Sequence, residues 1–380
     1  MEIYLDNSAT TRICSEAAEK MIYVINNVYG NPSSLHSKGN EARHEIMFAR
    51  TMVAQSLGVS DEEIYFTSGG TEANNLAVFG AAHARKKRGN KIVTTAVEHS
   101  SVLESCKALE DEGFEVEYIS PGADGCVSKE QLFEAIDENT VLVSVMMVNN
   151  ETGAVFPVEC IREIVEQKKA PALVHCDAVQ AYGKISVNPK KINCDLLTVS
   201  AHKIHGPKGS GALYVKDGVH IKPLIYGGEQ QYKLRPGTEA LPLIAGFGEA
   251  ARNIGSIKEN YIKMVKLKEY AARKLLSIDG VALNSPRNSL PYILNVSALG
   301  IKSETMLHHL EKKGIFISSG SACAKGKKSH VLSAIGLSPQ RQESALRISF
   351  SKYSCESEID ALADGLEEGV KTLVRSDGSK

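Results

Sequence analysis

Between residues 60 and 215, short runs rich in β-forming residues alternate with longer segments of helical character. The expected strands are Ile64–Thr67, Lys91–Thr95, Val116–Ile119, Val141–Val148, Ala172–Cys176, Leu196–Val199 and Gly211–Val215. The expected helices are Thr71–Arg85, with Thr71 as its N-cap, and then Ser100–Glu112, Ser128–Asp137 and Val158–Lys168. This alternation predicts a largely parallel sheet covered by helices on both faces.

After Gly248 the pattern changes. A long helix is expected over Ala250–Leu276, followed by shorter segments at Tyr292–Ser297, Ser303–Lys313, Phe316–Ser318, Ala345–Ser349 and Ser357–Val374. The 380 residues suit two domains at about 100–200 residues each. We therefore expect a large domain over residues 12–250, and a smaller α+β domain built from residues 1–11 and 251–380.

Composition excludes several classes of protein. Lys plus Arg number 44 against 45 Asp plus Glu, which argues against a strongly basic nucleic-acid binder. The longest apolar run, Val141–Val148, is far shorter than the roughly 18–20 residues that cross a bilayer. The start of the chain, with Glu2 and Asp6, lacks the cationic character of a secretory signal. We expect a cytoplasmic protein that binds neither membrane nor nucleic acid.

The strand Leu196–Val199 is followed by Ser200, His202 and Lys203, and then by a loop containing glycine and proline. Open α/β sheets bind ligands at the carboxyl ends of their strands. A buried lysine at such a place has a lowered pKa and can condense with an aldehyde. The alternative is a solvated lysine at a strand end, which is the usual state of an isolated Lys.

Asp177 and Gln180 follow another hydrophobic strand. A buried carboxylate is costly without a partner, and a protonated heteroaromatic nitrogen would be a suitable one. Gln180, three residues later, could reach the same ring. The alternative for Asp177 is a capping role at a strand–helix junction.

Three further segments place polar groups after predicted strands. Thr67-Ser-Gly-Gly-Thr-Glu-Ala-Asn74 offers a helix N-terminus to a phosphate, although a simple helix cap is the alternative. His99 could stack on a planar ligand or carry protons, and Asn150 could hydrogen-bond a substrate or a ring oxygen. Together, the five segments match what pyridoxal 5'-phosphate (PLP) requires of a protein.

The chain resembles the cysteine desulfurases, a class V branch of the fold-type I PLP-dependent enzymes, nearly from end to end. The motifs that carry the resemblance are Tyr4-Leu-Asp-Asn-Ser-Ala-Thr-Thr11, Gly30-Asn-Pro-Ser-Ser34, Thr67-Ser-Gly-Gly-Thr-Glu72, Val148-Asn-Asn-Glu151, Asp177-Ala-Val-Gln180, Ser200-Ala-His-Lys203, Arg235-Pro-Gly-Thr238, Ser318-Ser-Gly-Ser-Ala-Cys323 and Arg347-Ile-Ser349. The pair formed by Ser200–Lys203 and Ser318–Cys323 is the most specific, because few PLP enzymes have the second motif. The fold implied is that of a fold-type I PLP-dependent transferase, with a mainly parallel mixed sheet flanked by helices and a smaller α+β domain.

The resemblance also implies roles for residues around the cofactor. Lys203 would form the Schiff base with PLP, Asp177 would contact the pyridine nitrogen, Gln180 the ring hydroxyl, and His99 would stack on the ring. The phosphate contacts would come from Gly70, Thr71, Ser200 and His202, and from Thr238 across the interface of a homodimer. Asn150 would contribute both to the cofactor site and, with Arg347, to binding of the substrate carboxylate.

Cys323 lies in a small, polar segment that is followed by Lys325, Lys327 and Lys328. Nearby positive charge in an exposed loop favours the thiolate form. The resemblance implies that Cys323 takes the sulfur of L-cysteine as a persulfide and leaves L-alanine, with Lys203 or His99 as proton carrier. Since there is no C-x-x-C motif, no resident metal is expected. Cys323 remains a candidate for transient ligation of an iron–sulfur cluster.

The sulfur acceptor is expected to be a protein, either an iron–sulfur scaffold or a tRNA-thiolation enzyme. The segment after Cys323 is lysine-rich and slightly shorter than in the commonest scaffold-donating members, so both acceptors stay open. Other activities also stay open: a selenocysteine lyase, an aminotransferase, or a non-catalytic PLP-fold binding module. A nicotinamide-dependent dehydrogenase is disfavoured, because no G-x-G-x-x-G follows a strand.

Overall fold

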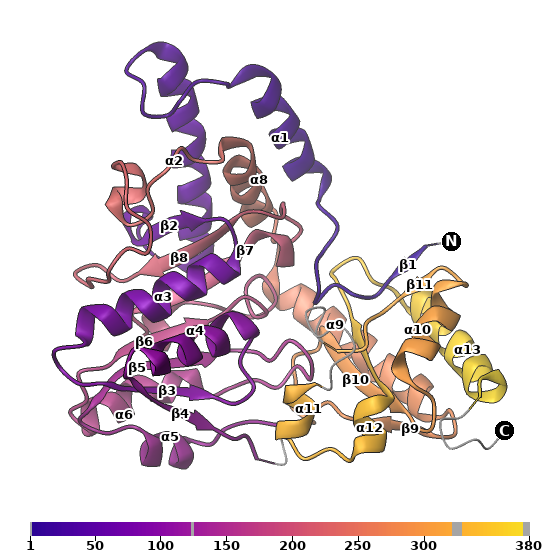
Figure 1. The fold of residues 1–380 in the computed structure, drawn as a ribbon. Coiled ribbons are helices and arrows are strands. Elements are labelled where there is room, and N and C mark those ends of the chain that lie inside the picture. The colour runs from indigo at the N-terminus through magenta and orange to yellow at the C-terminus, as the bar shows by residue number, and fades with distance from the viewer. Residues whose placement is uncertain (1, 123–124, 321–328, 375–380) are drawn as a thin grey trace.

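The computed structural model describes residues 2–122, 125–320 and 329–374. Within these ranges the strands form sheets of seven, three and two strands (Figure 1). The seven-stranded sheet consists of β2 (Ile64–Thr67), β3 (Lys91–Thr95), β4 (Glu115–Ile119), β5 (Thr140–Met146), β6 (Leu173–Asp177), β7 (Leu196–Ser200) and β8 (Gly211–Val215). The sequence predicted each of these strands to within two residues at either end.

The order of strands in this sheet is β2-β8-β7-β6-β5-β3-β4. The five strands from β7 to β4 run parallel to one another. β8 is antiparallel to both of its neighbours, β2 and β7. The prediction of a mainly parallel mixed sheet is confirmed.

Both faces of the seven-stranded sheet are buried, because consecutive residues of a strand point to opposite sides. Ile92 and Leu142 pack into one hydrophobic cluster with residues of α3 (Gly70–Arg85) and α4 (Ser100–Asp111). Their neighbours Val93 and Val143 pack into a second cluster on the other face. That face is covered by α5 (Lys129–Ala135), α6 (Ile161–Gln167), α7 (Pro189–Ile192) and α8 (Leu241–Arg252). The structure confirms the expected helix–sheet–helix layering.

Several helix boundaries differ from the prediction, and two of these differences occur at glycines with positive φ. The helix expected to start from an N-cap at Thr71 begins at Gly70 instead, with Gly69 as N-cap at φ +153°. The single helix expected over Ala250–Leu276 is wrong. α8 ends at Arg252, and α9 (Ile257–Leu276) starts after Gly255, whose φ of +79° interrupts a right-handed helix, and after Ser256, which caps the new one.

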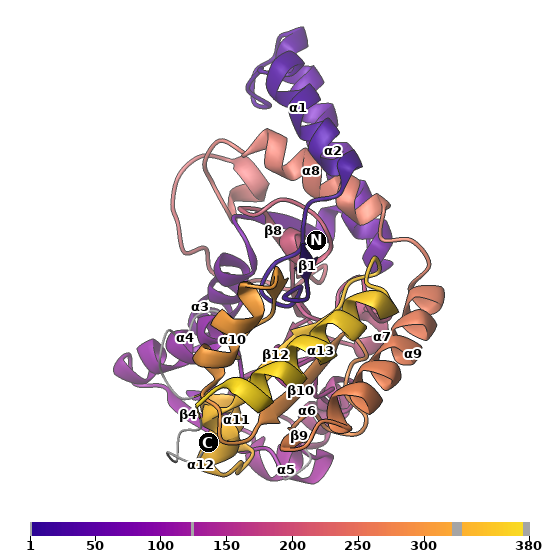
Figure 2. The same ribbon diagram turned by 90° about the vertical axis from the view of Figure 1, so that its right-hand side faces the viewer.

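Two helices near the N-terminus, α1 (Ser15–Asn27) and α2 (Ser37–Leu57), pack on α8 and extend away from the remainder of the molecule (Figure 2). Neither helix was predicted from the sequence. α2 and α8 approach closely at Gly248, where an added Cβ would lie 2.4 Å from Cα of Ala49.

The C-terminal part of the chain builds an antiparallel sheet in the order β12-β10-β9, from β9 (Val281–Leu283), β10 (Ile293–Ala298) and β12 (Ala345–Ser349). α9 and α13 (Glu356–Thr372) cross in front of this sheet in Figure 2. The remaining helices here are α10 (Ser303–Glu311), α11 (His330–Ala334) and α12 (Pro339–Glu343). No helix in the described ranges is long and apolar enough to span a membrane.

The start of the chain connects two groups of sheets: the seven-stranded sheet on one side, and the three-stranded and two-stranded sheets on the other. β1 (Ile3–Tyr4) pairs in parallel with β11 (Ile315–Phe316), and Asp6 then forms a bridge with Ser349 of β12. Farther along, the N–H of Thr11 donates to the carbonyl of His202, just after β7 (2.9 Å). We call residues 3–11 the N-terminal segment.

Candidate active site

A pocket lies at the carboxyl ends of β5, β6 and β7. The residues that line it are Ser8, Ala9, Gly70, Thr71, Asn74, His99, Ser101, Met146, Val148, Asn150, Asp177, Val179, Gln180, Ser200, His202, Lys203 and Arg347. Parallel strands expose their carboxyl ends along one edge, which is why residues far apart in sequence meet there. Of the site residues predicted from sequence, the pocket brings together Gly70, Thr71, His99, Asn150, Asp177, Gln180, Ser200, His202, Lys203 and Arg347.

Asp177 ends β6 and is 5% exposed. One carboxylate oxygen accepts from Nδ2 of Asn74 on α3 (2.7 Å), and the other accepts from the N–H of Val179 (2.9 Å). Both donors are neutral, so the negative charge has no cation among these partners. A buried carboxylate of this kind is suited to a protonated ring nitrogen in the pocket.

Lys203 closes a 3₁₀ turn, Ala201–Lys203, that directly follows β7. Its Nζ donates to the carbonyl oxygens of Ser8 (2.5 Å) and Ala9 (2.8 Å) in the N-terminal segment. The amine is thereby held at the pocket wall by two neutral acceptors, with its side chain among the lining residues.

His99 is the N-cap of α4, and its Nδ1 accepts from the N–H of Ser101 (3.2 Å) and contacts the hydroxyl of Ser101 (2.9 Å). Because Nδ1 is an acceptor, the proton of the neutral ring lies on Nε2. Burial lowers the pKa of His99, while the charge of Asp177 acts in the opposite direction. An uncharged imidazole beside the pocket is compatible with stacking on an aromatic ring.

The N-terminus of α3 forms one end of the pocket, where Gly70 and Thr71 offer first-turn N–H groups. A Cβ on Gly70 would lie 3.0 Å from Cγ2 of Val179, so little room exists for a side chain. Ser200 is fully buried, and its hydroxyl has no hydrogen-bond partner among the described residues. These donors suit an anion such as a phosphate.

His202, on the same side of the pocket, is uncharged at neutral pH. Burial and the positive charge of Lys203 lower the pKa of His202 to about 3. Its Nδ1 lies 3.2 Å from the hydroxyl oxygen of Thr10 in the N-terminal segment.

Gln180 is fixed from both ends of its amide group. Its Nε2 donates to the carbonyl of Ser8 (2.9 Å), and its Oε1 accepts from Nζ of Lys184 (2.9 Å). Lys184 is 5% exposed and does not line the pocket. Burial, together with the charges of Lys203 and Arg347, lowers the pKa of Lys184 to about 7. This lysine sets the orientation of the Gln180 amide.

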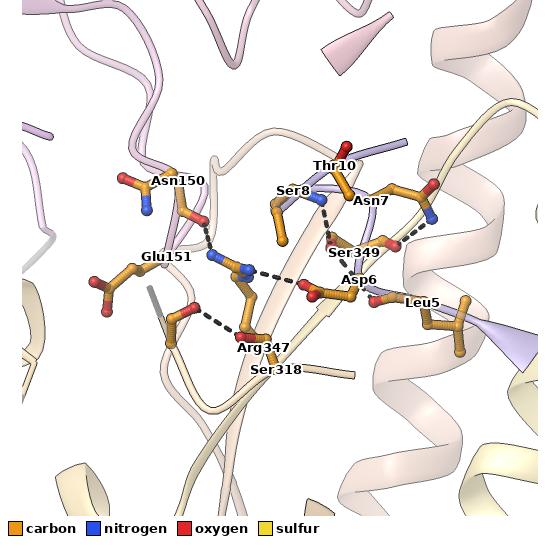
Figure 3. A network of polar contacts seen from close by, with 12 residues as sticks. Leu5, Asp6, Asn7, Ser8, Thr10, Asn150, Glu151, Ser318, Arg347 and Ser349 are labelled. Atoms are coloured by element: carbon orange, nitrogen blue, oxygen red, sulfur yellow. Dashed lines mark hydrogen bonds and ion pairs between the residues drawn. The ribbon is translucent and has the colours of Figure 1, made fainter. Parts of the chain in front are cut away.

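Arg347 approaches the pocket from β12 and is 1% exposed (Figure 3). Its Nη2 lies 2.8 Å from Oδ1 of Asp6, and its Nη1 donates to the carbonyl of Asn150 (3.1 Å). The guanidinium therefore reaches the carboxyl end of β5 from the other group of sheets.

Among the described residues, one predicted site residue is absent from this pocket: Thr238 is exposed and does not line it. Nearby Arg235 pairs with Glu72 in the first turn of α3 (2.7 Å), which ties the segment before Thr238 to the helix N-terminus at the pocket. Cys323 lies outside the described residues.

Several residues that build the site were not predicted from the sequence to have a role in it. Ser8 and Ala9 belong to a motif quoted for the resemblance, yet nothing in their composition indicates a lysine partner. Asn74 lies one helical turn after Gly70, a spacing that could have placed it beside Asp177. Nothing in the sequence around Lys184 indicates that it contacts Gln180. In the described ranges, no group of three or more His, Cys, Asp or Glu side chains is arranged to hold a metal ion.

The sequence matches the family model of the class-V aminotransferases over residues 3–362. It is 40% identical over 375 residues to the cysteine desulfurase IscS of Methanosarcina thermophila, covering 98% of this chain and 92% of the relative. It is 41% identical over 382 residues to the putative cysteine desulfurase IscS 1 of Bacillus subtilis, covering 98% and 99%.

The chain is also similar to solved structures of related proteins. A NifS-like protein superposes with a TM-score of 0.93 at 40% identity, over 98% of this chain and all of the other. A structure described as SspA in complex with cysteine has a TM-score of 0.82 at 35% identity, over 93% of this chain and all of the other.

Proposed function

Because the chain belongs to the class-V aminotransferase family and, within it, to the PLP-dependent cysteine desulfurases, we propose that its own residues release sulfur from L-cysteine and pass it on. The reaction converts L-cysteine to L-alanine. One observation best supports the roles proposed for these residues: Lys203 and the buried carboxylate of Asp177 line the same pocket.

The residues present fit PLP. Asp177 offers a buried negative charge to the pyridine nitrogen, and the unpartnered hydroxyl of Ser200 is available to the phosphate. Gly70, Thr71 and His202 are proposed to complete the phosphate contacts, and Gln180 to reach the ring hydroxyl. When bound, PLP supplies an electron sink for the bonds around the substrate Cα.

We propose Nζ of Lys203 as the group that binds the cofactor aldehyde and afterwards carries the substrate α-proton. The sequence left His99 as a second proton carrier. His99 Nδ1 is already engaged by Ser101, and burial keeps the ring neutral, which supports a stacking role instead. Arg347 and Asn150 are proposed to hold the substrate carboxylate.

Cys323 is proposed as the sulfur acceptor within the enzyme. The described residues on either side of 321–328 both come close to Glu151. Ser329 donates to its carboxylate (2.5 Å), and a Cβ on Gly320 would lie 3.4 Å from the same oxygen. Ser318 exchanges two backbone hydrogen bonds with Arg347 (2.7 and 3.1 Å). The chain therefore enters and leaves this segment beside the proposed substrate site.

In the sulfur step, the Cys323 thiolate attacks the substrate sulfur. A new S–S bond forms as the C–S bond of the substrate breaks, and the electron pair of that bond returns to the carbon skeleton. Protonation of the carbon skeleton gives alanine, and Cys323 keeps the sulfur as a persulfide. An acceptor thiol then removes the terminal sulfur by an exchange akin to thiol–disulfide exchange.

The test compares two cysteine variants of the PLP-loaded enzyme. Cys323→Ser should retain the cofactor absorbance but form no persulfide from L-cysteine and release no sulfide. Cys355→Ser is the matched control, since Cys355 is an exposed cysteine that does not line the pocket, and it should behave as the wild type. Undiminished sulfide release by Cys323→Ser would reject Cys323 as the acceptor.

The acceptor outside the enzyme is proposed to be a protein, an iron–sulfur scaffold or a tRNA-thiolation enzyme, in the cytoplasm. Cys323 would be the residue through which an iron–sulfur cluster is transiently ligated. Each candidate acceptor can be tested by following labelled sulfur from L-cysteine to the purified acceptor.

We further propose a homodimer in which Thr238 reaches the phosphate site of the partner subunit. Large apolar side chains are exposed around the α1–α2 turn and before Thr238, including Tyr29 (77%), Leu35 (92%) and Tyr226 (82%), which supports burial against a second copy.

The proposed division into domains is the one expected from the sequence: residues 12–250 form the large domain, and residues 1–11 with 251–380 form the small one.

A further inference from the structure

Arg347 has a carboxylate partner that the proposed reaction does not use. A buried guanidinium is costly unless its charge and its N–H groups are satisfied. Among the described residues, Asp6 is the carboxylate within ion-pair distance of Arg347 (2.8 Å), although the two are 341 positions apart in sequence. Figure 3 shows the Asp6 side chain pointing at the guanidinium from the N-terminal segment.

Asp6 is held in place by its own backbone and by its neighbours. It forms a bridge with Ser349, which lies two residues beyond Arg347 on β12. The side chain of Asn7 donates to the carbonyl of Ser349 (2.9 Å), and the N–H of Ser8 donates to the hydroxyl of Ser349 (2.8 Å). The carboxylate is thus clamped to the strand that carries Arg347.

The remaining donors of Arg347 are available to a ligand. A guanidinium has five N–H groups, and the described contacts use one towards Asp6 and one towards the carbonyl of Asn150. Nε is buried and has no partner among the described residues. Arg347 lines the pocket, whereas Asp6 does not. The aspartate therefore contacts the guanidinium from outside the pocket.

We infer that Asp6 is a positioning residue: it fixes the Arg347 guanidinium so that its unused N–H groups face the carboxylate of the amino-acid substrate. This inference rests on the proposed role of Arg347. The opposite arrangement would have Asp6 compete with the substrate carboxylate for the same guanidinium. The clamp to Ser349 favours positioning, because it holds Asp6 at β12 and away from the pocket lining.

The test measures equilibrium binding of two amines to the PLP-loaded enzyme by absorbance titration. L-Alanine carries the carboxylate, and ethylamine is the same molecule without it. Asp6→Ala should weaken binding of L-alanine by about tenfold, the order expected for loss of a hydrogen bond to a charged group, and leave binding of ethylamine unchanged. In turnover of L-cysteine, KM should rise more than kcat falls.

Asp6→Asn keeps an oxygen acceptor for Nη2, so its affinity for L-alanine should stay within about threefold of the wild type. Asp360→Ala is the matched control, since Asp360 forms an exposed ion pair with Lys274 (2.9 Å), and it should bind both amines as the wild type does. Thermal unfolding of each variant without cofactor reports whether it folds. If Asp6→Ala does not fold, Asp6→Ser, whose side chain is too short to reach Nη2, takes its place with the same expected loss of L-alanine binding.

Four results would separate the hypotheses. Tighter binding of L-alanine by Asp6→Ala would overturn positioning in favour of competition. An equal loss for L-alanine and ethylamine would also overturn it, because the effect would not concern the carboxylate. If Arg347→Lys weakens L-alanine binding and Asp6→Ala does not, only the inference about Asp6 fails. If neither variant affects it, the proposed role of Arg347 fails as well.

Discussion

Glu98 is fully buried after β3, directly before His99. Its Oε1 accepts from the hydroxyl of Thr95 (2.8 Å) and the N–H of Met146 (2.9 Å), and its Oε2 has no partner among the described residues. Burial raises the pKa of Glu98 from 4.5 to about 8. The side chain is therefore a neutral acid at neutral pH, and it fastens the His99 segment to the end of β5.

Glu98→Gln should remove a pH-dependent loss of stability. The folded-state pKa is raised, so the folded protein binds a proton that the unfolded chain releases between about pH 4.5 and 8, and stability falls across that window. Glutamine does not ionise. The melting temperature of the variant relative to wild type, both without cofactor, should therefore increase from pH 5 to pH 8.

Glu104→Gln is the control for this experiment, since Glu104 is an exposed carboxylate whose side chain is 68% accessible. Its melting curve should follow the wild type at every pH. Parallel pH profiles for Glu98→Gln and wild type would show that Glu98 is ionised in the folded protein.

Sequence alone could identify the residues at the ends of hydrophobic strands, and it could not identify those that act through tertiary contacts. Asp177 and Lys203 were found because a buried strand delivers each of them to the ligand-binding edge of a sheet. Lys184 and Asp6 were missed because an ordinary lysine and an ordinary aspartate acquire their environment only from Gln180 and Arg347.

At the scale of elements, most strands were predicted closely because they are short apolar runs buried on both faces, as β5 is. β4, at the edge of the sheet, was predicted as well, although most of its residues are partly exposed. The helix boundaries were harder to predict from the sequence. Gly69 as a cap and Gly255 as a break are backbone conformations at positive φ, and an isolated glycine in a helical pattern does not by itself indicate either. α1 and α2 were not predicted, although they pack on α8.

The contact between α2 and α8 gives a test at this scale. In Gly248→Ala the new Cβ would lie 2.4 Å from Cα and 2.6 Å from Cβ of Ala49. Because the nearest atom is backbone, the two helices must separate, and we expect a loss of about 1–3 kcal/mol in the free energy of unfolding. Urea unfolding of the cofactor-free protein measures it.

Gly369→Ala on α13 is the matched helical control. Its new Cβ would meet the flexible side chain of Met306, 2.7 Å from the sulfur, which can move aside. Helix propensity favours alanine by up to about 1 kcal/mol, so this variant should be neutral or slightly stabilised. Equal losses for the two variants would contradict the packing argument for α2 and α8.

At the scale of the whole molecule, the N-terminal segment links the group of sheets that carries Arg347 to the one that carries Lys203. Asp6 and Ser8 contact β12, and the carbonyls of Ser8 and Ala9 hold Nζ of Lys203. Such a link between sequence-distant groups was beyond sequence reasoning. The proposed homodimer concerns the same scale, because a single chain leaves Thr238 exposed and outside its own pocket.

A mixed dimer tests whether Thr238 acts across the interface. Thr238→Ala should weaken PLP retention, and Lys203→Ala should abolish turnover. A heterodimer of the two variants would contain one site with Lys203 from one subunit and Thr238 from the other, so that one site should regain wild-type PLP retention and turnover. If Thr238 served its own subunit, no site would recover. Sedimentation of the protein as a 41.1 kDa monomer would contradict the homodimer itself.

The proposed roles of the pocket residues all depend on Lys203 as the amine that binds the cofactor aldehyde. Borohydride reduction of the PLP-loaded enzyme, followed by peptide mapping, tests it directly, and Lys184 is the internal rival because burial lowers the pKa of Lys184 to about 7. We predict that the pyridoxyl label is found on the peptide containing Lys203 and is absent from the one containing Lys184. A label on Lys184, or on any lysine other than Lys203, would show that Lys203 is not the cofactor-binding amine.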